Sequence, residues 1–192
     1  MSSAPPAPRE FFEAFLPAWF AANGGATTNA SSPGSLVFHV DAETYALRLD
    51  AGKLVVAAGS SAEAILQVSL RSPDFAELIR GAQPLLDAGA SDRLLALRSL
   101  SLDAERAQMI RQVDGSVAFE VTDASDVRTL LLTPGASVVG AAPPACTVRV
   151  ASVDFWALSR GEKNPFELLM DGKIRMQGRM EVAMALSSVL LG

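Results

Sequence analysis

The chain has 192 residues, of which 49% are hydrophobic and 19% are charged, and its formal net charge is −5. This acidic balance, without any basic run, argues against nucleic acid as a partner. The one cysteine, Cys146, excludes a disulfide framework, and the one histidine, His39, excludes a two-histidine zinc motif.

The chain begins with a Pro-rich stretch and an apolar helix. Residues 1–8 predict a disordered tail, which lacks the basic-then-apolar order of a signal peptide. From about Arg9 to Asn23, Phe and Trp recur at helical spacing, and at Pro17 we expect either a kink or two abutting helical turns. The segment Gly24–Ser35 is rich in Gly, Ser and Thr and predicts a linker.

Short alternating or β-branched segments then predict four strands: Leu36–Val40, Thr44–Asp50, Lys53–Gly59 and Ala64–Leu70. A helix is expected to follow, with Ser72 as N-cap and Pro73 at its first position, and to end at Arg80. A further strand, Leu95–Leu100, and a helix, Leu102–Gln112, complete this part. Four antiparallel strands followed by helices are typical of an α+β fold.

Two blocks of sequence recur at nearly the same spacing. Residues 34–40 match residues 115–121 at four of seven positions, and residues 72–81 match residues 152–161 at six of ten. This recurrence predicts a tandem duplication of about 80 residues. We therefore expect three parts: the tail, helix and linker (1–32), a first repeat (33–112) and a second repeat (113–192).

The second repeat carries an ordered series of motifs. An alternating strand starting at Cys146 leads to an Asp154-Phe155 helix start, and Asn164-Pro165 predicts another helix with Asn164 as N-cap. Gly172 and Gly178 stand where positive φ angles would end that helix and the last strand. An apolar helix from Met180 to Leu191 closes the chain. We expect Asp74 and Asp154, with Ser72 and Ser152, to act as helix caps.

This series resembles the sterol carrier protein type 2 family of lipid-binding domains. The resemblance is clear over Val113–Gly192 and weaker over residues 33–112, where Gln83-Pro84 stands in place of Asn164-Pro165. It implies an α+β fold, internally duplicated, in which a curved five-stranded antiparallel or mixed sheet is backed by helices and encloses an apolar tunnel. The side chains expected near that tunnel are Phe119, Trp156, Phe166, Leu169, Met170, Met176, Met180, Met184 and Leu186.

The resemblance implies binding, and possibly transfer, of a hydrophobic small molecule such as a sterol, a fatty acyl or an isoprenoid lipid. Methionine adapts to ligands of irregular shape, although the same side chains could simply fill a core. We expect no enzymatic activity, cofactor or metal, because His39 has no carboxylate or nucleophile at a suitable spacing, and Cys146 begins an inward-facing strand. A small hydrolase is therefore disfavoured.

An interaction or dimerisation module, accessory to an enzyme, is the alternative. The Phe/Trp stripe of the first helix, including Phe11, Phe15 and Trp19, would then bind a partner enzyme or a second copy of the chain. No apolar run of about 18 residues occurs, so no integral membrane segment is expected. The composition and the missing signal favour a bacterial, cytoplasmic location.

Overall fold

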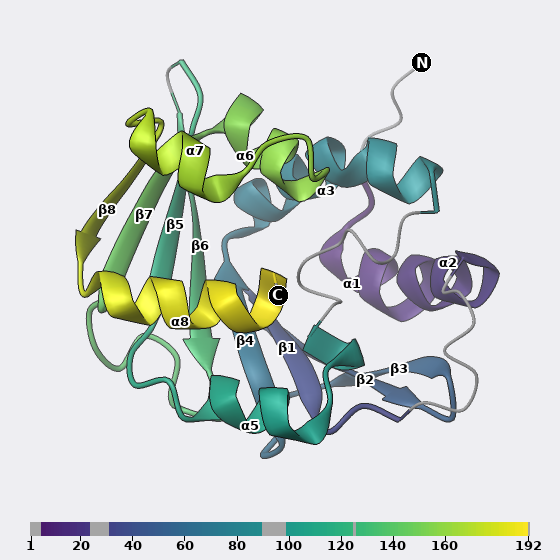
Figure 1. Cartoon of the computed structure of the whole chain (residues 1–192). Coiled ribbons are helices and arrows are strands. Elements are labelled where there is room, and N and C mark those ends of the chain that lie inside the picture. Colours follow the sequence, from purple (N-terminus) through teal and green to yellow (C-terminus); the bar gives the residue numbers. More distant parts are fainter. Residues whose placement is uncertain (1–4, 24–30, 90–98, 125, 192) are drawn as a thin grey trace.

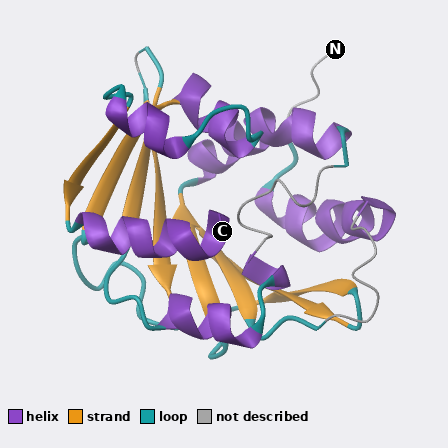
Figure 2. Ribbon diagram, viewed as in Figure 1, coloured by secondary structure: helices purple, strands orange, loops and turns teal. Residues whose placement is uncertain are grey.

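The computed structural model describes residues 5–23, 31–89, 99–124 and 126–191. It is an α+β structure in which a mixed eight-stranded sheet is backed by helices (Figures 1 and 2). The predicted linker falls mostly on residues 24–30, and the start of the predicted tail on residues 1–4, both outside the described residues.

The described residues of the first half form an N-terminal helical segment, four strands and two later helical elements. In chain order these are α1 (Pro8–Glu10), the π-helical turn η1 (Phe11–Phe15), α2 (Leu16–Asn23), β1 (Ser35–Val40), β2 (Glu43–Asp50), β3 (Lys53–Ala58), β4 (Ala64–Leu70), α3 (Ser72–Asp87) and the short 3-10 helix η3 (Ser99–Ser101). The four predicted strands are therefore present. Ala51 and Gly52 both have positive φ angles, 47° and 77°, as a two-residue turn between β2 and β3 requires.

The second half alternates strands and helices. Its elements are α5 (Ala104–Arg111), β5 (Val117–Thr122), β6 (Val127–Pro134), β7 (Cys146–Ala151), α6 (Ser152–Ser159), α7 (Pro165–Met170), β8 (Ile174–Gly178) and α8 (Met180–Leu191). The side chain of Asn164 accepts a hydrogen bond from the backbone N–H of Phe166 at 2.9 Å, which confirms the predicted N-cap of α7. Gly172 and Gly178 have the expected positive φ angles, 68° and 97°.

The strand order is β3-β2-β1-β4-β6-β5-β7-β8. In the first half β1 pairs antiparallel with β2 and parallel with β4, and in the second half β5 pairs the same way with β6 and β7. Phe38 lies opposite Val68, and Phe119 lies opposite Val148. These partners are related by the spacing of the sequence repeat. The pairing agrees with a duplicated chain, and the duplication itself stays a prediction.

In the described part of the chain, the two halves contribute four strands each and join where β4 of the first half lies beside β6 of the second. In the repeat, β6 corresponds to β2 and β7 corresponds to β4. Among the described residues, no strand of the second half pairs with β6 as β3 pairs with β2, and no strand of the first half pairs with β4 as β8 pairs with β7. These two edges pair with each other antiparallel, with Leu66 opposite Pro134 and Ser69 opposite Leu131. The chain therefore forms one continuous sheet rather than the five-stranded sheet that the resemblance implied. Because β4 and β6 cover each other's edges, neither of these two strands is open to pairing with another chain.

The N-terminal helical segment packs onto the first half. The ring of Phe12 lies 4.6 Å from that of Tyr45 and 4.9 Å from that of Phe38, measured between centroids. The indole N–H of Trp19 donates a hydrogen bond of 2.8 Å to the backbone carbonyl of Leu86 in α3. Phe11 and Trp19 are buried within this chain, so the expectation that they offer an exposed face to a partner is wrong.

Pro17 does not produce a simple kink between two helices. Instead the helix widens just before it, because the backbone N–H of Leu16 bonds the carbonyl of Phe11, five residues earlier. Such a single wide turn accommodates an extra residue without ending the helix.

Helix α3 differs from its prediction at both ends. Its N-cap is Arg71 rather than Ser72, and the Asp41 carboxylate accepts a hydrogen bond of 3.1 Å from the backbone N–H of Ser72. Asp74 accepts hydrogen bonds of 2.7 and 3.1 Å from the Arg71 guanidinium. The helix continues through Gly81 and Pro84 to Asp87. The helix-breaking cost of these two residues, about 1 and 3 kcal/mol, is offset by burial of the apolar face of the helix, which consists of Phe75, Ile79, Ala82, Leu85 and Leu86.

Three further expectations are corrected. The first four strands are not all antiparallel, because β4 returns beside β1 in the parallel direction. Within the predicted strand Leu95–Leu100, the described residues 99 and 100 belong to η3, and residues 95–98 lie outside the described part. Asp154 does not cap α6, since its carboxylate accepts a hydrogen bond of 2.5 Å from the Lys163 ammonium.

Candidate functional site

One row of apolar side chains crosses the helix-covered face of the second half of the sheet. Pairing between β6, β5, β7 and β8 places Leu130, Phe119, Val148 and Met176 side by side. Val148 is only 4% exposed, whereas Leu130, Phe119 and Met176 are half-buried. The helices therefore leave part of this row uncovered, and we call Leu130, Phe119 and Met176 the apolar strip.

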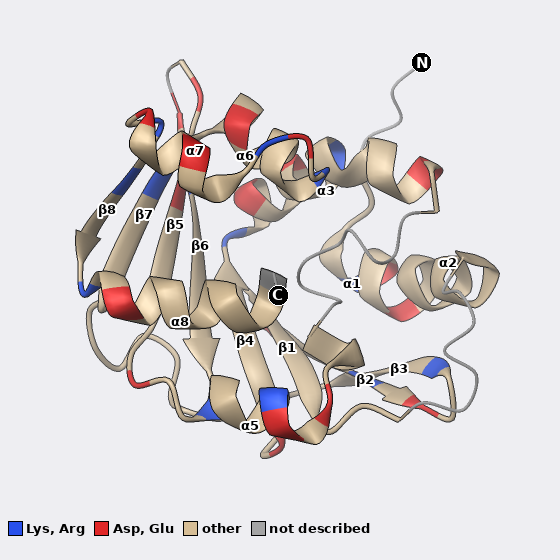
Figure 3. Ribbon diagram, viewed as in Figure 1, with Lys and Arg blue, Asp and Glu red and all other residues tan. Residues whose placement is uncertain are grey.

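Helix α8 covers the sheet beside this strip. It turns four apolar side chains inward, namely Val182, Ala183, Leu186 and Val189. Its one charged residue, Glu181, lies in the first turn, and the rest of the helix is uncharged (Figure 3). The α8 side of the site is thus apolar along nearly its whole length.

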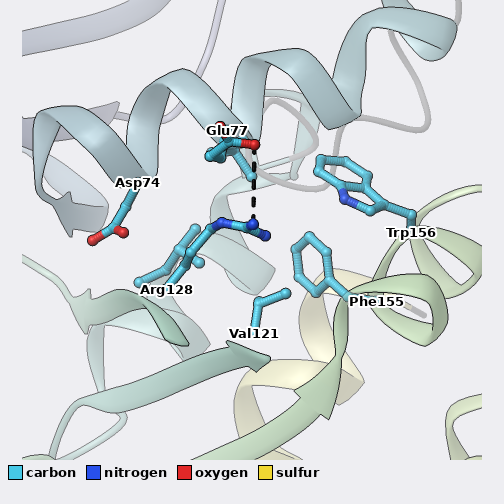
Figure 4. A pocket seen from close by; sticks show the side chains of 8 residues that line it. Asp74, Glu77, Val121, Arg128, Phe155 and Trp156 are labelled. Carbon is cyan, nitrogen blue, oxygen red and sulfur yellow. Dashed lines mark ion pairs between the residues drawn. The ribbon is translucent and has the colours of Figure 1, made fainter. Parts of the chain in front are cut away.

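A small cavity adjoins the strip at Leu130. Val121 and Leu130 of the sheet, Phe155 and Trp156 of α6, and Leu78 of α3 provide its apolar lining. Asp74, Glu77 and Arg128 provide its polar lining, and Figure 4 shows the Arg128 guanidinium below Glu77 and beside Phe155. The cavity volume of about 20 Å³ is enough for roughly one water molecule.

Trp156 can line the cavity because the residue of α3 opposite its indole ring is a glycine, Gly81. A Cβ atom at Gly81 would overlap the indole of Trp156. Gly81 therefore allows α3 and α6 to approach each other, although α3 belongs to the first half of the chain and α6 to the second. The cavity lies where the two halves meet.

Arg128 is the positively charged residue among those that line this cavity. Its side chain is 17% exposed, and it donates a hydrogen bond of 2.6 Å to Asp123. Glu77 and Asp126 lie 4.0 Å from its Nη2 and Nε atoms, respectively. The hydrogen bond to Asp123 raises the pKa of Arg128, so the guanidinium is charged at every ordinary pH. Its Nε–H is buried and has no hydrogen-bond partner among the described residues.

The structure separates the nine predicted site residues into three groups. Phe119 and Met176 lie in the apolar strip, and Trp156 lines the cavity. Leu186 is buried on the inner side of α8, and Leu169 is half-buried. The other four are exposed on the short helix α7 and on α8, with Met170 at 87%: Phe166, Met170, Met180 and Met184.

Seven residues that line the cavity were not predicted as site residues from the sequence: Asp74, Glu77, Leu78, Val121, Arg128, Leu130 and Phe155. Arg128 carried a usable signal, because it occupies the same parity of β6 as Leu130 and Leu132, on the inward side. Leu78 and Glu77 had none, since their place depends on how α3 packs across the junction.

His39 has a structural role on the opposite face of the sheet. The Gln67 amide nitrogen donates to the carbonyls of Gly135 and Ser137 at 2.9 and 2.7 Å, so its oxygen faces His39 Nε2 at 2.9 Å. Nε2 therefore carries the proton, and Nδ1 lies 3.2 Å from the Thr44 hydroxyl. Both ring nitrogens are thus occupied.

A second, open depression of about 450 Å³ adjoins His39 and is lined by both polar and apolar residues: His39, Asp41, Ser69, Leu70, Arg71, Asp74, Thr129 and Val139. Cys146 is buried, and burial raises the pKa of its thiol, which keeps the thiol protonated and unreactive.

Within the described ranges, no helix combines the length and apolarity needed to span a membrane.

Comparison with known proteins gives a family match over just over half of the chain. The model described as the SCP-2 sterol transfer family matches residues 92–191, a range that starts before α5. No curated protein sequence matches the chain significantly.

Three solved structures illustrate the similarity. Sterol carrier protein 2 like 2 from Aedes aegypti is 21% identical, with a TM-score of 0.39, and the match covers 58% of this chain and 98% of that one. The sterol carrier protein domain 2 of Helicoverpa armigera is 22% identical, with a TM-score of 0.37 and coverage of 50% and 81%. The apo form of sterol carrier protein 2 from Yarrowia lipolytica is 17% identical, with a TM-score of 0.34 and coverage of 42% and 75%.

Proposed function

We propose that this chain, which belongs to the SCP-2 sterol transfer family, binds a hydrophobic ligand along the apolar strip. The observation that carries the proposal is that Phe119, Leu130 and Met176 stay half-buried on a sheet face that helices otherwise cover. Membership of the family supports a binding or carrier role rather than catalysis. A sterol, a fatty acyl chain or an isoprenoid lipid would each provide an apolar surface to cover the exposed part of the strip.

Burial of an alkyl chain provides enough free energy for useful affinity. About 12 methylene groups at about 0.8 kcal/mol each give roughly 10 kcal/mol of transfer free energy. Association costs reduce this figure, and a dissociation constant of about 1 μM needs roughly 8 kcal/mol. Because the association cost is at least about 4 kcal/mol, roughly 6 kcal/mol remains, and binding in the tens of micromolar is the expected scale for a chain of this length.

The ligand chain does not fit into the cavity beside Leu130. That cavity has about 20 Å³, whereas pockets for drug-sized ligands have roughly 300–1,000 Å³. We therefore place the chain along the strip, with the half-buried side chains of Phe155, Trp156 and Leu169 moving aside. The remaining predicted residues are proposed as contacts in this opened form: Phe166, Met170, Met180, Met184 and Leu186.

A charge in the strip tests the proposal. Met176→Glu should lower the affinity for a fluorescent long-chain fatty alcohol by at least about tenfold, because a carboxylate would be buried against the ligand. The matched control is Met109→Glu, which changes an exposed methionine of α5 outside the strip and should leave the affinity unchanged. Equal affinities for the two folded variants, or no binding by the unmodified chain, would contradict the proposal.

The structure does not support the alternative in which the N-terminal helical segment is an interaction module. Phe11 and Trp19, which were to form the docking face, are buried against the first half of the same chain. Phe15 is the partly exposed member of the group.

A further inference from the structure

An unpaired hydrogen-bond donor marks one end of the apolar strip. Arg128 lies next to Leu130 on the inward side of β6, with Thr129 between them facing the other way, and both line the small cavity. The Nε–H of Arg128 is buried and meets no acceptor in the described part of the chain. A buried charged group with an unmet donor is costly, so this position favours an incoming oxygen atom.

We infer that Arg128 Nε receives the uncharged oxygen of a lipid head group, a hydroxyl or a carbonyl, while the lipid chain lies along the strip. This inference rests on the proposed function. The cavity has room for one oxygen atom beside Arg128. The Arg128 donor at one end and Met176 at the other then fix the direction of the ligand: head at the junction of the two halves, chain toward β8.

The surrounding charges select against an anionic head group. Arg128 already faces three carboxylates: Asp123 by a hydrogen bond of 2.6 Å, and Glu77 and Asp126 at 4.0 Å. Asp74, which also lines the cavity, has its own partner in Arg71. A carboxylate or phosphate entering here would meet more negative charge than the single guanidinium can balance. A neutral oxygen accepts the hydrogen bond without that repulsion.

Three ligands with the same chain length and different heads test the inference on the full chain: dodecan-1-ol, dodecanoate and dodecane. At about pH 8 dodecanoate is ionised, since carboxylic acids have pKa values of about 4–5. We expect dodecan-1-ol to bind about tenfold more tightly than dodecane, which has no acceptor. Dodecanoate should bind more weakly than dodecan-1-ol, and equilibrium dialysis with labelled ligands measures all three affinities.

The diagnostic variant is Arg128→Lys. It puts a methylene group where Nε stands and keeps a positive charge for Glu77 and Asp123, so the fold is retained. The advantage of dodecan-1-ol over dodecane should fall by about tenfold while dodecane binding stays unchanged. Arg149→Lys, an exposed residue that pairs with Glu120 on the other face, is the matched control and should change neither affinity.

A second variant tests the charge argument. Glu77→Gln removes one carboxylate 4.0 Å from the guanidinium and should raise the affinity for dodecanoate several-fold, with little effect on dodecan-1-ol. Tighter binding of dodecanoate than of dodecan-1-ol by the unmodified chain would overturn the inference. So would an unchanged preference in Arg128→Lys, which would mean that a water molecule alone meets the donor. If none of the three ligands binds, the proposed function fails instead.

Discussion

At the scale of single residues, a few side chains have surroundings that differ sharply from those of their neighbours. Arg128 is a charged residue at an inward position of β6, next to the apolar strip. Gly81 is required because the indole of Trp156 occupies the space where a side chain would begin. Local sequence patterns predicted the cap at Asn164 and the positive φ angles of Gly172 and Gly178. They did not predict the role of Gly81, because it depends on a contact between two helices, and the parity of β6 was the one local signal that Arg128 carried.

Tyr45 provides a prediction at this scale, because it is the single tyrosine of the chain. Burial, and a hydrogen bond from its hydroxyl to Glu43 at 2.8 Å, raise its pKa to about 12, from an ordinary value of about 10. A raised pKa stabilises the folded chain fully below about pH 10. That contribution is lost as the pH rises through about 12.

Tyrosinate absorbance measures this titration without ambiguity of assignment. We expect the folded chain to titrate near pH 12 and the chain in denaturant near its ordinary value of about 10. Glu43→Gln should lower the folded value, because both the hydrogen bond and the negative charge of Glu43 contribute to the shift. A folded titration with the ordinary midpoint would contradict the buried position of Tyr45.

At the scale of elements, the positions of the strands in the sequence were easier to predict than which strands pair with each other. The alternation of Leu66, Val68 and Leu70, and of Cys146, Val148 and Val150, marked the inward faces of β4 and β7, and these side chains are buried. The parallel pairing of β1 with β4 and the β4–β6 junction depend on long-range contacts that periodicity does not encode. Helix α3 was predicted too short, since burial outweighs the local signals of its Gly and Pro.

The N-terminal helical segment gives a prediction at this scale. Phe12 is 1% exposed and packs against Phe38, Tyr45 and Phe75, whereas Phe15 on the same turn is 37% exposed. We expect Phe12→Ala to lower the free energy of unfolding by about 3–5 kcal/mol, the usual range for a buried Phe. Phe15→Ala, the matched control, should cost far less. Urea unfolding measures both, and equal losses would show that the segment does not pack as described.

At the scale of the whole molecule, one sheet runs through both halves. The edges of β4 and β6 pair with each other, so the four described strands of each half belong to a single sheet. The α3–α6 contact adds a second junction through Gly81 and Trp156. The hydrophobic excess of the sequence therefore supplies a shared core as well as the apolar strip. The sequence repeat indicated two similar units, but it held no information on how their edges would meet.

This arrangement predicts that the two halves unfold together. Trp19 belongs to the first half and Trp156 to the second, so Trp156→Phe and Trp19→Phe each leave one fluorescent reporter. In each variant, we expect the urea midpoint from tryptophan fluorescence to coincide with the midpoint from far-ultraviolet circular dichroism. Fluorescence midpoints that depart from circular dichroism in opposite directions would mean that the halves unfold independently.

The location of the ligand is the central claim, and photo-cross-linking tests it most directly. A long-chain fatty alcohol carrying a diazirine in its chain would be bound to the full chain, illuminated, and its adducts mapped by peptide mass spectrometry. We expect adducts on β5, β8 and α6, around Phe119, Met176 and Phe155, and their loss on competition with unlabelled alcohol. Competable adducts confined to the N-terminal helical segment or to β2 and β3 would contradict the account.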